Sequence, residues 1–156
     1  MSWYRISSAD YPQFSGIGAA LFGGRWTSPG NRAVYCGQSL STCRLELLSQ
    51  LFRSKEFPRS IWRKIDIPSN IDVLEIDVTA LPNNWNDLDD VSACRIIGDE
   101  WYDSGKYLGL IVPSVPAGGD RNLIINETHA DFSMLNISAA FPLTWDKRLF
   151  PLAMLA

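Results

Sequence analysis

The chain has 156 residues, of which 46% are hydrophobic and 20% are charged. This is the composition of an ordinary globular protein, and the length favours one domain over residues 1–156. The formal net charge of −3 argues against a protein that binds nucleic acid directly through a basic face. No apolar run reaches the roughly 18 residues of a membrane helix, and the N-terminus lacks the pattern of a secretory signal. We therefore expect a cytoplasmic protein without membrane contact.

The first half of the chain predicts a strand followed by a helix. Residues 32–36, RAVYC, indicate a short strand. Apolar residues then recur at helical spacing at Leu40, Cys43, Leu47, Leu48 and Leu51. Ser39 or Ser41 is the expected N-cap of this helix. At the angular spacing of a helix, Glu46 lies about 120° from the centre of the apolar stripe. Its carboxylate can therefore extend past the helix edge toward a cleft.

The second half predicts strands and one further helix. The strands are expected at 60–67, 72–78, 107–114, 121–126 and within the tail 139–150. Asp89 or Asp90 opens the helix, which ends at residues 104–105. Gly98 lies in the apolar face of this helix and weakens the prediction, since glycine costs about 1 kcal/mol relative to alanine. Because strands outnumber helices and do not alternate regularly with them, the pattern favours an α+β fold over a doubly wound sheet.

Cysteine and histidine usage does not indicate a metal site. Cys36, Cys43 and Cys94 form no C-x-x-C pair, so we expect reduced thiols, neither a disulfide framework nor a zinc site. His129 has no second histidine with which to share an ion, so we expect no metal. A nucleophile made from Cys36 or Cys43 with His129 is supported by no motif.

The glycines at 16 and 18 do not make a dinucleotide-binding loop. They follow no predicted strand, open no clear helix and have no third glycine in register, so a Rossmann interpretation is not favoured. The sequence also lacks a P-loop lysine.

Residues 21–37, LFGGRWTSPGNRAVYCG, place one arginine between a glycine pair and a tryptophan. Two interpretations of Arg25 stay open at this point. It is either a surface arginine stacked on Trp26, or a guanidinium held in a loop to bind phosphate through its planar set of donors.

Four residues suit the binding and cleavage of a pyridine dinucleotide, although each alone is more often structural. Arg25 would bind the pyrophosphate, and Tyr35 would stack on the charged nicotinamide. Glu46 would hold the ribose and stabilise the oxocarbenium-like state as the N-glycosidic bond breaks. Ser114 would hydrogen-bond the carboxamide or the ribose. Further polar candidates are Arg5, Asn122, Asn126 and His129. Spacing alone does not establish this grouping.

Four segments carry a resemblance to a known family. They are WYRI (3–6), GGRWTSPGNRAVYCGQSLSTCRLE (23–46), VPSVPAGGDRNLIINETHADF (112–132) and LTWDKRLF (143–150). In this order and spacing the chain resembles the RES-domain family, named for arginine, glutamate and serine, whose members are toxins of bacterial toxin–antitoxin pairs. The resemblance implies a mixed α/β core similar to ADP-ribosyltransferases, with a central NAD⁺ cleft.

Carried over residue by residue, the family's arginine, aromatic, glutamate and serine correspond to Arg25, Tyr35, Glu46 and Ser114. Arg5 matches a recurrent N-terminal arginine, and we expect Arg5 and Asn122 to line the NAD⁺ site as well. The chain departs from the family at Glu127, where proline is usual, and at Thr27, where asparagine is common. We expect both departures to alter local loop geometry without contacting the four central residues.

The resemblance implies an NAD⁺-degrading toxin, either a glycohydrolase or a phosphorylase, which uses NAD⁺ as its substrate and needs no metal. A mono-ADP-ribosyltransferase that modifies a host protein is the alternative, and a non-catalytic nucleotide-binding module is a second one. The implied partner is an Xre-type helix-turn-helix antitoxin, with which the chain forms a hetero-oligomer.

Overall fold

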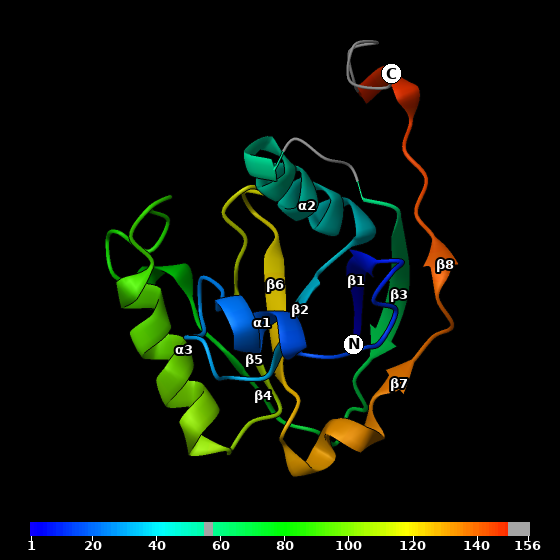
Figure 1. Ribbon diagram of the computed structural model, residues 1–156. Coiled ribbons are helices and arrows are strands. Elements are labelled where there is room, and N and C mark those ends of the chain that lie inside the picture. Colours follow the sequence, from blue (N-terminus) through cyan, green and yellow to red (C-terminus); the bar gives the residue numbers. More distant parts are fainter. Residues whose placement is uncertain (55–57, 150–156) are drawn as a thin grey trace.

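The structure is a computed structural model that describes residues 1–54 and 58–149 (Figure 1). The strands are β1 (Ser2–Ser8), β2 (Ala33–Gly37), β3 (Ser60–Asp66), β4 (Val73–Glu75), β5 (Gly109–Pro113), β6 (Arg121–Asn126), β7 (Asn136–Ile137) and β8 (Phe141–Pro142). The α-helices are α1 (Ile17–Phe22), α2 (Leu40–Ser54) and α3 (Ser92–Ser104). Short 3₁₀ turns are η1 (Val78–Ala80), η2 (Ala130–Met134) and η3 (Lys147–Leu149).

The strands form one mixed sheet in the order β4-β5-β6-β2-β1-β3-β7, and β8 also pairs with β3. All pairs are antiparallel except β4 with β5. The register of β2 and β6 places Gly37 opposite Asn122, and Gly37 also faces Tyr4 of β1. Strands from the start, the first third and the last third of the chain thus lie side by side in the centre of the sheet (Figure 1). The predicted α+β class is confirmed.

Both faces of the central strands are buried, which explains the apolar runs at 109–113 in β5 and 123–125 in β6. Successive side chains of a strand point to opposite faces. In β6, Leu123 and Ile125 belong to one buried cluster together with Trp3 of β1 and Ile65 of β3, while the intervening Ile124 belongs to another. The second cluster also holds Trp26, Leu81, Cys94, Trp101, Leu110 and Val112.

A serine side chain caps the start of α2, whereas the N-cap of α3 is Val91, which makes no side-chain cap bond, and not Asp89 or Asp90 as expected. Ser39 is the N-cap of α2, since its Oγ accepts a hydrogen bond from the Thr42 amide at 3.0 Å, which decides between the two serines. Before α3, which begins at Ser92, the Asp90 carboxylate accepts from the Ser92 amide at 2.9 Å. Gly105 ends α3 in the left-handed conformation, as expected from the sequence. Within residues 1–54 and 58–149, no helix has both the length and the apolarity that crossing a membrane requires.

Gly98 is required by packing. A Cβ at this position would overlap the main-chain carbonyl of Trp26, so α3 and the loop before β2 can approach each other only at a glycine. The propensity penalty that weakened the helix prediction is therefore offset by a close helix–loop contact.

Two sequence predictions are wrong in detail. The strand expected over 72–78 ends at Glu75, because the Asp77 carboxylate accepts from the Thr79 amide and closes the 3₁₀ turn η1. Val78, beyond the end of the strand, is half-exposed at 51%. The segment around Gly16 and Gly18 does open a helix, the six-residue α1. The tail strand is the two-residue β8, and Phe150 lies outside the described residues.

Candidate functional site

A cavity of about 780 Å³ opens between α2 and the middle of the sheet. Its walls come from β1, β2, β6, the start of α1, the loop 23–26, the segment preceding α3 and the turn after β5. Five of the six candidate residues line it: Arg5, Arg25, Tyr35, Glu46 and Asn122. The sixth, Ser114, donates a hydrogen bond to the carboxylate of Glu46 at the cavity wall. The fold thus brings together residues that lie up to 117 positions apart, from Arg5 to Asn122.

Glu46 is fixed at the cavity wall by two donors from the sheet. The Ser114 hydroxyl donates to Glu46 Oε1 at 2.7 Å, and Asn122 Nδ2 donates to the same oxygen at 2.5 Å. Ser114 itself is buried and accepts from the Ala117 amide at 3.1 Å. Among the described residues, no donor is bonded to the second carboxylate oxygen, Oε2. Glu46 therefore has one oxygen held by the protein and one available to a ligand.

Arg25 is held by main-chain carbonyls. Its Nη1 donates to the carbonyl of Trp85 at 2.9 Å and to that of Asp87 at 2.7 Å. Among the described residues, no carboxylate lies within salt-bridge distance of Arg25, although the Asp87 carboxylate interacts with it electrostatically. Trp26 points into the core, where it is only 2% exposed. The interpretation of Arg25 as a surface residue stacked on Trp26 is therefore not supported by the structure.

Tyr35 supports the loop that carries Arg25. Its hydroxyl accepts from the Trp26 amide at 3.2 Å and lies 2.9 Å from Thr27 Oγ1. A Cβ on Gly24 would collide with the Tyr35 hydroxyl, which explains the glycine before Arg25. Burial raises the pKa of Tyr35 to about 12, against the opposing effect of the bonds to Thr27 and Trp26. The expectation that Thr27 would not contact the central residues is wrong, because Thr27 bonds one of them.

Arg5 is a second cation at the cavity without a carboxylate partner among the described residues. Its Nη1 donates to the Tyr35 carbonyl at 2.9 Å, and burial lowers its pKa. Its Nε is buried and has no hydrogen-bond partner, and the same holds for Oδ1 of Asn122. Buried polar atoms are nearly always paired in proteins. Both atoms are closed off from solvent, so they are unsatisfied polar groups inside the wall of the cavity.

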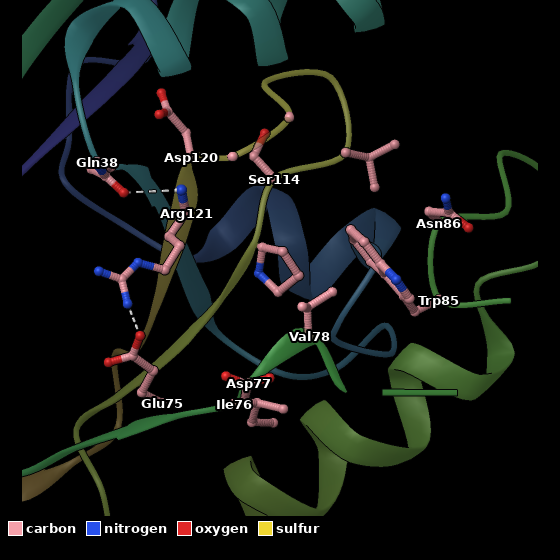
Figure 2. Close-up of a pocket in the computed structure, with 14 residues that line it drawn as sticks. Gln38, Glu75, Ile76, Asp77, Val78, Trp85, Asn86, Ser114, Asp120 and Arg121 are labelled. Carbon is pink, nitrogen blue, oxygen red and sulfur yellow. Dashed lines mark hydrogen bonds and ion pairs between the residues drawn. The ribbon is translucent and has the colours of Figure 1, made fainter. Parts of the chain in front are cut away.

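A second cavity of about 580 Å³ lies on the other side of the turn after β5 (Figure 2). It shares Pro113 and Val115 with the first cavity, and Ser114 lies in the wall between them. Figure 2 shows Arg121 reaching Glu75, with which it forms an ion pair, while its amide donates to Gln38 Oε1 at 3.1 Å. The only cation of this lining is therefore paired internally.

Other polar candidates do not join the first cavity. Asn126 accepts from the amide and hydroxyl of Thr128 at the far end of β6. His129 Nδ1 accepts from the Asp131 amide and caps η2. Glu127 accepts from the Gly16 amide at 2.7 Å and forms a 2.9 Å ion pair with Arg32, so it anchors the start of α1. Asn126, His129 and Glu127 therefore have structural roles.

The cysteines do not form a nucleophilic site. All three are free thiols and buried, and burial raises the pKa of Cys36 to about 12 and that of Cys43 to about 11. A thiolate is the reactive form, so these residues are inert near neutral pH. Within residues 1–54 and 58–149, no group of three or more His, Cys, Asp or Glu side chains is placed to hold a metal ion.

Sequence reasoning missed the segment 85–91 before α3. Its carbonyls at Trp85 and Asp87 bind Arg25, and its side chains Leu88 and Val91 line the cavity. It also missed Asp99, whose carboxylate accepts from Ser28 and thereby ties the loop after Arg25 to α3. Main-chain carbonyls leave no side-chain signal in a sequence. Asp99 was one acidic residue among several on a predicted helix.

Comparison with known proteins gives a consistent result. Residues 2–146 match the model of the RES domain. A protein named Toxin Res from Photorhabdus laumondii is 37% identical over 135 residues, which are 85% of each chain. A protein of the same name from Yersinia enterocolitica is 31% identical over 153 residues, covering 96% of this chain and 99% of that one.

Two further matches describe particular proteins. One, from a Sphingobium species, is named Prs ADP-ribosylating toxin and is 31% identical over 140 residues, covering 83% of this chain and 84% of that one. The other is a chain in the crystal structure of the M. tuberculosis MbcT–MbcA toxin–antitoxin complex. It has a TM-score of 0.78 and 25% identity, covering 92% of this chain and 84% of that chain.

The role of the Tyr35 hydroxyl predicts a pH-dependent effect on stability. We expect Tyr35→Phe to lower the free energy of unfolding by about 1–2 kcal/mol near pH 8, because the Trp26 amide loses its acceptor. The folded-state pKa of Tyr35 is raised from 10.0 to about 12, so its contribution is present below pH 10 and lost as the pH rises from 10 toward 12. The difference between wild type and variant should therefore shrink over this range. Urea unfolding at pH 8 to 11.5 measures it, and a difference that stays constant would contradict the assigned burial.

Proposed function

The chain belongs to the RES-domain family, and on this premise we propose that it is an NAD⁺-degrading toxin that cleaves the bond between nicotinamide and ribose. The observation that carries the proposal is the carboxylate of Glu46, held by Ser114 and Asn122 at a cavity that also contains two arginines without carboxylate partners among the described residues. A fixed carboxylate beside an anion-binding region is what cleavage of a cationic N-glycosidic bond requires.

The cavity suits NAD⁺ in size and charge. About 780 Å³ is within the range of small-molecule sites. Nη1 of Arg25 donates to main-chain carbonyls, which do not cancel its positive charge, and the guanidinium also interacts with the Cys94 thiol. The donors of Arg25 that these contacts do not use would bind the pyrophosphate of NAD⁺.

The chemistry follows from how Glu46 is held. As nicotinamide leaves, it takes the electron pair of the glycosidic bond and becomes neutral, so positive charge moves to the ribose. Oε1 is fixed by its two donors, which leaves Oε2 to stabilise that charge and hold the ribose hydroxyls. The ring of Tyr35 lines the cavity and would contact the nicotinamide. Water or phosphate then attacks the ribose, which makes the protein a glycohydrolase or a phosphorylase.

One relative favours a second function. The Sphingobium protein is named for ADP-ribosylation of Prs. The same site would perform that reaction if a side chain of a host protein replaced water or phosphate as the acceptor. A non-catalytic nucleotide-binding module is less favoured, because binding alone does not need a carboxylate held in this way.

The test is incubation of the purified protein with cytoplasmic concentrations of NAD⁺, with and without phosphate, followed by product analysis. We expect free nicotinamide together with ADP-ribose or its phosphate. ADP-ribose attached to added cell protein would instead show transferase activity. Unchanged NAD⁺, with binding detected by calorimetry, would refute both catalytic functions.

We also propose that the chain is inhibited by an Xre-type helix-turn-helix antitoxin, with which it forms a hetero-oligomer. The structural match to a chain of a toxin–antitoxin complex supports an antitoxin partner. Arg25 and Arg5 would accept a carboxylate of that partner as they would a phosphate. With a net charge of −3, this chain is poorly suited to bind promoter DNA, which would be the partner's role.

The antitoxin proposal predicts the outcome of expression in bacteria. We expect the chain alone to stop growth while intracellular NAD⁺ falls, and co-expression of the neighbouring helix-turn-helix gene to prevent both. The purified complex should not bind NAD⁺ until the partner is removed. Normal growth with unchanged NAD⁺, at confirmed soluble expression, would refute the toxin proposal.

The role of Glu46 predicts a specific kinetic effect. Glu46→Gln keeps an Oε1 acceptor for Ser114 and Asn122 but removes the charge, so we expect kcat to fall by about 10²–10³-fold while NAD⁺ binding changes little. Nicotinamide release measures kcat and calorimetry measures binding. Glu100→Gln, on the exposed surface of α3, makes the same chemical change and should be neutral. A Glu46→Gln variant that keeps most of its kcat would contradict the assignment.

The contacts of Arg25 lead us to expect that a positive charge alone is not sufficient for NAD⁺ turnover. A lysine in its place keeps one positive charge but cannot bind two carbonyls and a phosphate with a planar set of donors. We therefore expect Arg25→Lys to lower NAD⁺ turnover nearly as much as Arg25→Ala. Arg59→Lys, at an exposed arginine outside the cavity, serves as the matched control. Full activity of Arg25→Lys would remove Arg25 from the phosphate site.

A further inference from the structure

Asp120 forms a contact that the proposed chemistry does not use. Its Oδ2 accepts a hydrogen bond of 2.5 Å from the hydroxyl of Thr42, a residue of α2 that is fully buried at 0% exposure. The same hydroxyl lies 2.9 Å from Ser39 Oγ, the N-cap of the helix. Figure 2 shows the Asp120 carboxylate directed toward α2, close to Ser114.

One helical turn further along α2, a second side-chain contact joins the helix to β6, from Asn122 to Glu46. Thr42 and Glu46 are four residues apart, so they lie on one face of the helix with a rise of about 6.0 Å between them. Asp120 and Asn122, at the start of β6, are two residues apart and have a rise of about 6.6 Å. Thr42 binds Asp120 and Glu46 binds Asn122. The two spacings match, so two parallel contacts join the helix to the strand.

Asp120 also closes the turn that carries Ser114. Its carbonyl accepts from the Ser114 amide at 2.9 Å, and its amide donates to the carbonyl of Ala117 at the same distance. The Ala117 amide in turn donates to Ser114 Oγ, which donates to Glu46. One residue therefore links the serine turn, the strand with Asn122 and the helix with Glu46.

We propose that Asp120, through Thr42, is a positioning residue that sets Glu46 in register with Ser114 and Asn122. This inference rests on the proposed function, because its consequence is a correctly placed carboxylate. Cys43 Sγ of α2 donates to the Tyr4 carbonyl of β1 at 3.0 Å, but toward β6 and the serine turn the remaining side-chain bonds of α2 among the described residues are those of Glu46. Without the contact at Thr42, rotation of the helix would therefore displace the carboxylate. Small displacements of a catalytic group lower rates strongly.

The experiment compares Thr42→Val, Asp120→Ala, the double variant and Thr42→Ser, with kcat and KM for nicotinamide release. Thr42→Val preserves shape and removes the hydroxyl. We expect each single variant to lower kcat by about 10- to 100-fold with little change in KM. The double variant should be no slower than the singles, because both changes break one contact. Thr42→Ser, which keeps the hydroxyl, should restore kcat.

A control variant distinguishes a positioning role of the Thr42–Asp120 contact from a purely structural role. Thr128→Val removes a comparable hydroxyl bond, to Asn126 at the opposite end of β6. It should change the melting temperature but not kcat. Folded Thr42→Val and Asp120→Ala variants with wild-type kcat would overturn the proposal.

A wild type that releases no nicotinamide would refute the proposed function and not this inference. In that case, amide hydrogen exchange tests the positioning role without any activity. Thr42→Val should speed the exchange of the Ser114 and Ala117 amides, and Thr128→Val should not. Equal protection of these amides in wild type and in Thr42→Val would refute the positioning role.

Discussion

The arrangement of the site depends on the carboxylate of Glu46, which joins α2 to the sheet. A helix packed on a sheet through apolar contacts alone can rotate or slide, since such contacts have little directionality. Hydrogen bonds from Ser114 and Asn122 are directional and end on a single oxygen, so together with the bond from Thr42 to Asp120 they fix the position of the helix on the sheet. The cavity lies under this helix, and its form follows from that constraint.

The regular elements could be predicted from the sequence where local pattern and burial agree. The strands at 109–113 and 121–126 contain continuous apolar runs because both of their faces are covered. The helix at 40–54 has a clear apolar stripe and a serine cap. The strand predicted over 72–78 is too long, because the alternating pattern continues past Glu75 into a turn that is fixed by the Asp77 side chain. The six-residue α1 has no buried residue and therefore no pattern to detect.

The residue types of the candidate site could be predicted from the sequence, but the contacts between these residues could not. The family resemblance grouped Arg25, Tyr35, Glu46 and Ser114, and the fold brings these residues around one carboxylate and one cavity. What they contact was not predictable. Tyr35 uses its hydroxyl to hold the loop of Arg25, and Arg25 binds carbonyls of a segment sixty residues away. Contacts to the main chain depend on the path of the backbone, which side-chain patterns do not encode.

The electrostatics of the cavity explain how an acidic chain can favour an anionic ligand. Arg5 and Arg25 each donate through Nη1 to main-chain carbonyls, which leave the charge of the guanidinium intact. A carboxylate partner would instead have neutralised each charge and closed it to a phosphate. Glu46 does not neutralise either arginine in this way, since its Oε1 is bonded to the neutral groups of Ser114 and Asn122. In the part of the chain that the structure describes, Arg5, Arg25 and Glu46 thus line one cavity without forming ion pairs with one another. Such an arrangement is costly in a folded protein unless a ligand with separated negative and positive charge completes it. In the proposed function, the pyrophosphate and the nicotinamide ribose of NAD⁺ would provide that separation.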